Sequence, residues 1–279
     1  MELLSVLIAL AFDQANRHHR DRRLLATFAE RICGRWALLG LIVFVSLVSV
    51  CNYLLRNISP LLAGLFGVVV LVFCLGMGEL LVKLRDFAYM RERDDEEGAR
   101  HAASALAGRE VCSSGARLTR EMMAVVLVEG HARGFGILFW YLVFGPAGAL
   151  FAGLVRHIAL PSCQAVMKRM SFAATLYWWL DWIPARISAL SYGLAGSLTH
   201  AIGNWQVRAG EWDTPNTAVL IASGTGALLL ETEEQTDLLS RASLEEQEAV
   251  VQNARDLVMR ALTIWITIVA LITLGGWLK

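Results

Sequence analysis

The stretch WALLGLIVFVSLVSVCNYLL (Trp36–Leu55) decides the fold of this chain. It runs for twenty residues without a charged side chain. A helix needs about twenty mainly apolar residues to cross the hydrocarbon core of a bilayer. The strands of a transmembrane barrel would instead alternate in polarity, and this stretch does not. We therefore predict a membrane-spanning helix at this position.

Composition extends this prediction to the whole chain. Hydrophobic residues make up 56% of the sequence, and the mean hydropathy is +0.51. We predict an all-α, polytopic helical integral membrane protein with four or five transmembrane helices and soluble helical insertions, in a single membrane domain over residues 1–279. The further spans are expected at Leu61–Val82, Gly134–Val155, Phe172–Gly203 and Ala261–Trp277.

The basic residues predict the orientation. Arginines are dense in the segment 13–35, and nine Lys or Arg residues lie between Lys83 and Arg133. Because such residues concentrate on the cytoplasmic side, we expect a basic cytoplasmic segment at 13–35 and a cytoplasmic helical insertion at 83–133. A second soluble helical insertion is expected at 204–257, where Ser243-x-x-Glu246 is a capping box that starts a helix.

The run Gly134–Val155 contains Gly145-Pro146 at its centre, and this leaves two interpretations open. The run is either one kinked span or a re-entrant hairpin whose irregular centre is buried in protein. The distribution of basic residues between the two sides of the membrane does not distinguish these two interpretations. The sequence favours the kinked span.

The segment DWIPARISALSYGLAG (Asp181–Gly196) places two charges and a proline in apolar sequence. Asp181 and Arg186 are five residues apart, and Pro184 is expected to break or kink the helix between them, which could bring them together. They either form an interfacial pair that anchors a helix start, or Arg186 binds a phosphate or carboxylate in a polar cavity.

Three further polar residues are candidates for ligand binding. Glu129 and His131 precede the third span and would take part in proton transfer if a cleft united them, but the pattern favours solvated boundary residues. Asn216 precedes SGTGAL (Ser223–Leu228), whose small residues favour close helix packing over nucleotide binding. The scattered cysteines and histidines predict no metal site, and the zero net charge predicts no nucleic-acid partner.

Three motifs resemble those of a known superfamily. They are GFGILFWYLVFGPAGALFAGL (Gly134–Leu154), DWIPARISALSYGLAG, and NWQVRAGEWDTPNTAVLIASGTGAL (Asn204–Leu228). Together they resemble the AmpE and CobD/CbiB superfamily of bacterial inner-membrane proteins. The AmpE branch fits better, because VEGHARGFG keeps Glu129 but has His131 and Arg133 where the synthase pattern has polar and acidic residues.

The resemblance implies two alternative functions. An AmpE-like protein would be a non-catalytic regulator of β-lactamase expression in the bacterial inner membrane, linked to a cell-wall-recycling amidase. A CobD/CbiB-like protein would be a cobinamide-phosphate synthase of cobalamin synthesis that uses ATP. The first alternative is favoured, so we expect no catalytic residue, and the ligand-binding candidates are Asp181, Arg186, Glu129, His131 and Asn216.

Overall fold

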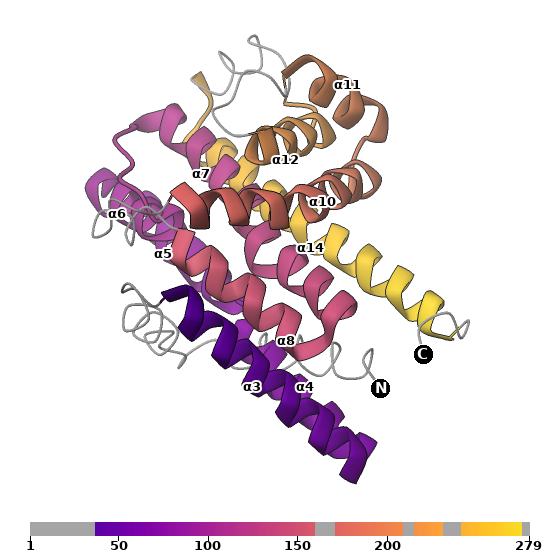
Figure 1. Ribbon diagram of the computed structural model, residues 1–279. Coiled ribbons are helices and arrows are strands. Elements are labelled where there is room, and N and C mark those ends of the chain that lie inside the picture. The colour runs from indigo at the N-terminus through magenta and orange to yellow at the C-terminus, as the bar shows by residue number, and fades with distance from the viewer. Residues whose placement is uncertain (1–36, 160–170, 209–214, 231–240, 275–279) are drawn as a thin grey trace. The chain divides into compact units, whose positions relative to one another are not determined.

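The computed structural model describes residues 37–159, 171–208, 215–230 and 241–274 (Figure 1). No strand occurs among these residues, and the all-α prediction is confirmed. The predicted basic segment 13–35 lies outside the described ranges. The helices are α3 (Ala37–Ile58), α4 (Pro60–Cys74), α5 (Met77–Glu92), α6 (Glu96–Ala107), α7 (Gly115–Gly130), the π-helix η1 (His131–Phe135), α8 (Gly136–Ala159), α10 (Ser171–Ala195), α11 (Leu198–Arg208), α12 (Pro215–Ala227) and α14 (Leu244–Leu274).

The chain forms two compact units, and each unit uses two separate stretches of sequence. Unit 1 consists of Met1–Glu79 and Arg133–Asp181. Unit 2 consists of Leu80–Ala132 and Trp182–Lys279. The chain passes between the units within α5, η1 and α10, so each unit is described by itself below.

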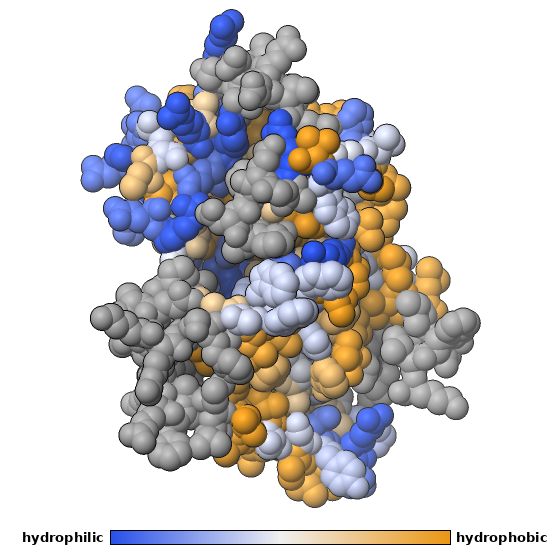
Figure 2. All heavy atoms as spheres, turned by 45° about the horizontal axis from the view of Figure 1, so that its top comes forward, coloured by the Kyte–Doolittle hydropathy of each residue, from blue (hydrophilic) through white to orange (hydrophobic). Residues whose placement is uncertain are grey.

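Unit 1 is built from α3, α4 and α8, which pack against one another. Ser59 ends the turn between α3 and α4, and Pro60 occupies the first helical position of α4, where its missing N–H costs no hydrogen bond. Many exposed side chains of α3 and α4 are apolar, including Leu47 and Leu61. Apolar side chains gather on the molecular surface in Figure 2, as expected of a protein that lies in lipid.

Three apolar helical stretches among the described residues are long enough to cross a membrane. They are Gly40–Ile58, Pro60–Glu92 and Gly115–Ala159. The prediction of a helical membrane protein is therefore confirmed. The predicted helix Leu61–Val82 is interrupted, because α4 ends at Cys74 and α5 begins at Met77.

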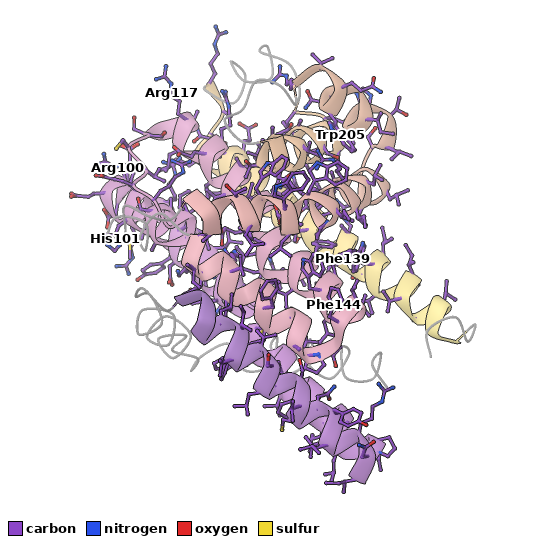
Figure 3. All side chains as sticks on the ribbon, in the orientation of Figure 1. Arg100, His101, Arg117, Phe139, Phe144 and Trp205 are labelled. Carbon is purple, nitrogen blue, oxygen red and sulfur yellow. The ribbon has the colours of Figure 1, made fainter. Side chains whose placement is uncertain are left out.

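The run Gly134–Val155 differs from the favoured prediction of one kinked helix. Gly145 has φ 66° and ψ −154°, a conformation outside the helical region that is open mainly to glycine. Gly148 packs against the backbone carbonyl of Trp140. These residues would lie about 12 Å apart along a straight helix, so the two arms of α8 fold back on each other. Trp140 also contacts Phe139 edge-on and stacks on Phe144 at 5.7 Å. Phe139 and Phe144 are labelled in Figure 3.

Unit 2 has α7 at its centre, in contact with α6, α12 and α14. Met122, Val126 and Leu127 of α7 are buried, so this apolar part of α7 packs against the neighbouring helices. The capping box at the start of α14 is also confirmed. The backbone N–H of Glu246 donates to the Ser243 hydroxyl at 3.3 Å, and the Ser243 N–H donates to the Glu246 carboxylate at 2.8 Å.

The predicted span Phe172–Gly203 is divided into two helices. α10 ends at Ala195 and α11 begins at Leu198. Of the two expected effects of Pro184, the structure excludes a break, because α10 continues through this residue. A proline inside a helix removes one backbone donor, which packing against neighbours can offset.

Candidate ligand-binding site

The candidate site lies in unit 2, where α7, α10 and α12 are joined by buried hydrogen bonds. The Tyr192 hydroxyl of α10 donates to the Leu127 carbonyl of α7 at 2.7 Å. The Ser223 hydroxyl of α12 donates to the Ala189 carbonyl of α10 at 2.6 Å. These two hydrogen bonds hold α7 and α12 against α10, the helix that carries Arg186.

Arg186 is oriented by three contacts. Its Nη1 donates to the Trp182 carbonyl at 2.9 Å and to the Asn216 Oδ1 at 3.2 Å. Its guanidinium carbon lies 3.9 Å from the centre of the Trp182 ring, within the range of a cation–π interaction. Arg186 and Asn216, which the sequence singled out separately, are thus brought together by α10 and α12.

His131 lies in the π-helix that follows α7. Its Nδ1 is 2.8 Å from the Ser188 hydroxyl, and both residues are buried. Either residue can donate this hydrogen bond, because a neutral imidazole has two tautomers. Single turns of π-helix occur often at functional sites, and here the wider turn coincides with a buried histidine.

Ser188 was not among the residues predicted from the sequence. It lies two positions after Arg186, within the motif already quoted, and its side chain is fully buried. A serine in an apolar helix commonly bonds to its own backbone, so the sequence carried no sign of a partner. The partner is 57 residues away in the chain.

Glu129 occupies the last turn of α7 and is buried, with 7% of its surface exposed. His131 is only 1% exposed. The preferred interpretation of both residues as solvated was therefore wrong. The reason is that α7 is covered by α14 and α12, contacts between segments that local spacing does not show.

Asp181 belongs to the part of α10 that lies in unit 1, whereas Arg186 belongs to unit 2. Because α10 is continuous, five residues of regular helix place them about 140° apart around its axis. The role of Asp181 in ligand binding stays a prediction.

SGTGAL is a helix-packing motif, as the sequence predicted. Gly224 lies against the Leu127 side chain, and Gly226 lies against the backbone of His200 and Ala201. Asn204 of α11 donates to the Ala222 carbonyl at 2.8 Å, which also ties α11 to α12. These contacts hold the helix that carries Asn216.

The chemistry of the site favours an anion over a metal. No group of three or more His, Cys, Asp or Glu residues converges within the described ranges. The guanidinium of Arg186 is suited to carboxylate or phosphate oxygens, including those of ATP. The Asn216 amide meets the guanidinium from α12. Ser188 is two positions after Arg186, about 160° around α10 from it, so the His131–Ser188 pair lies on the other side of this helix.

Comparisons with known proteins give consistent results. A family model described as "Regulatory signalling modulator protein AmpE" matches residues 1–279. A cobalamin biosynthesis protein CobD of Stutzerimonas stutzeri (strain A1501) is 27% identical over 236 residues, which cover 80% of this chain and 77% of the relative. A protein of the same name from Chromobacterium violaceum is 32% identical over 116 residues, which cover 40% of this chain and 37% of the relative. No solved structure matches.

Proposed function

Because the chain belongs to the AmpE family, we propose that it is a regulatory membrane protein that responds to an anionic ligand bound at Arg186. In this proposal it lies in the bacterial inner membrane, with 13–35 and 83–133 in the cytoplasm, and acts in β-lactamase induction and cell-wall recycling. A cell-wall-recycling amidase belongs to the same proposed pathway.

The observation that carries this proposal is the orientation of the Arg186 side chain. The Trp182 ring lies against one face of the guanidinium, and Asn216 accepts one of its N–H groups. A side chain ordered in advance loses little conformational entropy when a ligand binds. Arginine presents several donors in one plane, so a carboxylate or phosphate can take two of them together.

The His131–Ser188 pair supports a response to ligand binding. The hydrogen bond between them is buried and 2.8 Å long, and it joins the π-helix to α10 two residues from Arg186. A movement of α10 on ligand binding would change this bond. The pair thus offers a route from the ligand to α7.

The test is to measure binding of inorganic phosphate, acetate and ATP to the detergent-solubilised chain by calorimetry. Arg186→Lys keeps the charge but removes the planar donor group, and Arg186→Gln removes both. We expect the lysine variant to lose about tenfold in affinity and the glutamine variant to lose more. Arg260→Gln is the matched control, because Arg260 is an exposed arginine of α14. Equal affinities for wild type and Arg186→Lys would contradict the proposal.

A cellular test addresses the regulatory role. The Arg186 variants would replace the native chain in its host, and β-lactamase induction would be measured after exposure to a β-lactam. We expect reduced induction with Arg186→Gln and normal induction with Arg260→Gln, at equal protein levels. Normal β-lactamase induction with both variants would show that Arg186 takes no part in regulation.

A second candidate function is a CobD-like enzyme of cobalamin synthesis. It is supported by the 27% identity that extends over 80% of this chain. The test is to incubate the purified chain with a corrin acid, an amino-alcohol phosphate and ATP, and to look for the amide product. Product formation that depends on the chain would replace the regulatory proposal with this one.

A further inference from the structure

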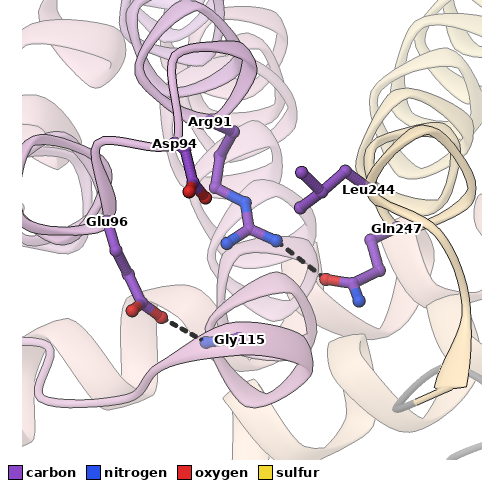
Figure 4. Close-up of a pocket in the computed structure, with 6 residues that line it drawn as sticks. All are labelled: Arg91, Asp94, Glu96, Gly115, Leu244 and Gln247. Carbon is purple, nitrogen blue, oxygen red and sulfur yellow. Dashed lines mark hydrogen bonds between the residues drawn. The ribbon is translucent and has the colours of Figure 1, made fainter.

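A separate cavity of about 250 Å³ lies in unit 2, between the end of α5 and the starts of α6, α7 and α14 (Figure 4). It shares no residue with the Arg186 site. Six residues line it, and three of them are charged. They are Arg91, Asp94, Glu96, Gly115, Leu244 and Gln247.

Arg91 is the most informative of these residues. It is only 6% exposed, and its Nη2 donates to the Gln247 Oε1 at 2.8 Å. The Thr119 hydroxyl donates to the same oxygen at 3.2 Å, so the amide is held in place. Within the described ranges, no carboxylate lies within ion-pair distance of Arg91, and its Nε and Nη1 have no hydrogen-bond partner.

A buried cation without a direct ion pair is costly, because burial removes its hydration. The carboxylate of Glu248 attracts Arg91, but only from beyond ion-pair distance. Gln247 is neutral, and its oxygen compensates only part of this cost. The guanidinium lies among the lining residues of the cavity in Figure 4. The remaining donors are therefore available to an anionic group of a molecule that enters.

Two carboxylates line the same cavity. Asp94 lies in the turn after α5 and has φ 58°, a left-handed conformation held by its N–H bond to the Arg91 carbonyl at 3.0 Å. Glu96 begins α6, and its Oε1 accepts from the Gly115 N–H at 2.6 Å. This bond fixes the Glu96 side chain while its second oxygen has no partner among the described residues.

We propose that this cavity binds a small zwitterion, an amino acid or dipeptide whose carboxylate meets Arg91 and whose ammonium meets Asp94 and Glu96. A simple anion would meet two repelling carboxylates, and a metal cation would meet the arginine. The volume of about 250 Å³ lies below the range of about 300–1,000 Å³ typical of drug-sized ligands. Leu244 supplies an apolar surface suited to an alkyl side chain.

The experiment is calorimetry on the full-length chain in detergent with L-alanyl-L-alanine as the probe. Two blocked forms serve as comparisons, the N-acetyl dipeptide without the ammonium and the C-terminal amide without the carboxylate. We expect the unblocked dipeptide to bind and each blocked form to bind at least about tenfold more weakly. Equal binding of the three compounds, or no binding of the unblocked dipeptide at millimolar concentration, would overturn the proposal.

Variants assign the binding to this cavity. Arg91→Gln is expected to weaken dipeptide binding by about tenfold or more. Arg93→Gln is the matched control, because Arg93 is exposed and stacks on Tyr89 at 4.3 Å. Glu96→Gln keeps an oxygen for the Gly115 N–H but removes the charge, so it tests the ammonium subsite even if Arg91→Gln does not fold. Unchanged affinity in Glu96→Gln would overturn the assignment.

Discussion

Replacing Gly226 by alanine should destabilise unit 2, because this residue lets α12 approach α11. A Cβ at this position would lie 2.5 Å from the His200 carbonyl oxygen and 2.8 Å from the Ala201 Cα. Both contacts are with backbone atoms, so the helices must separate. Overpacking of this kind costs about 1–3 kcal/mol, whereas alanine in place of glycine gains at most about 1 kcal/mol in helix propensity. We expect a net loss of about 1–2 kcal/mol.

Gly203→Ala provides the control on α11. Apart from its own stretch of helix, no atom of the described residues lies within 4 Å of the position its Cβ would occupy, so only the propensity gain applies. Thermal unfolding of the purified chain in detergent would be followed by circular dichroism. A loss of 1 kcal/mol corresponds to about 2–4 °C in a chain of this size, so Tm should fall by several degrees in Gly226→Ala and rise slightly in Gly203→Ala. A Tm for Gly226→Ala at or above that of Gly203→Ala would refute the reasoning.

Three further predictions follow from unit 2. The carboxyl of Glu248 has a buried Oε1 that finds no hydrogen-bond partner among the described residues, and burial followed by the nearby charge of Glu92 raises its pKa. The native state therefore binds this proton more tightly than the unfolded chain, and the ionised carboxylate destabilises the native state at neutral pH. Glu248→Gln should raise Tm at neutral pH, and this gain in Tm should disappear as the pH falls toward about 4.3. A gain in Tm that is constant with pH would contradict this prediction. Ser243→Ala removes the cap of α14 and should cost about 0.5–2 kcal/mol in thermal unfolding, and an unchanged Tm would show that the capping box contributes nothing. With the other cysteines replaced, the exposed Cys112 should react with an impermeant maleimide in inverted membrane vesicles but not in intact spheroplasts, and the opposite pattern would place 83–133 outside the cytoplasm.

Features set by neighbouring residues were predictable from the sequence. The continuous helix α14 and its capping box depend on contacts within three or four residues, which the pattern Ser243-x-x-Glu246 displays directly. The start of α4 at Pro60 follows from the fixed φ of proline in the same way. The chemistry of neighbouring residues was therefore sufficient to predict where these helices begin.

The breaks within apolar sequence were harder to predict. The gap between α4 and α5 has apolar residues on both sides, and the freed Gly76 N–H donates to the Arg133 carbonyl at 3.3 Å. This acceptor lies far away in the chain, so the residues near Gly76 do not predict the break between α4 and α5. The Gly145-Pro146 pair did mark an irregular point, but the direction of the chain beyond it depends on the φ of Gly145.

The site was predicted residue by residue but not as pairs. Arg186 stood out because charged groups in apolar sequence are costly, and Asn216 was named only as a polar residue that precedes SGTGAL. Their contact depends on how α12 packs on α10, which the sequence did not show. Ser188 was not predicted, because the hydroxyl of a single serine can bond to its own helix backbone. Placing it in an apolar helix therefore costs little free energy.

The polar groups of unit 2 that bond to other helices divide by the kind of partner they have. Tyr192 and Ser223 donate to backbone carbonyls, which cannot move without moving a helix, so these bonds hold the architecture. Arg186 donates to the Trp182 carbonyl and also to the side chain of Asn216, and His131 contacts the side chain of Ser188. A side chain can change rotamer or exchange its donor for a ligand atom without unfolding its helix. The side-chain pairs are therefore the part of this interior that a ligand could alter, which is why the Arg186 and His131 pairs, more than Tyr192 or Ser223, should govern regulation.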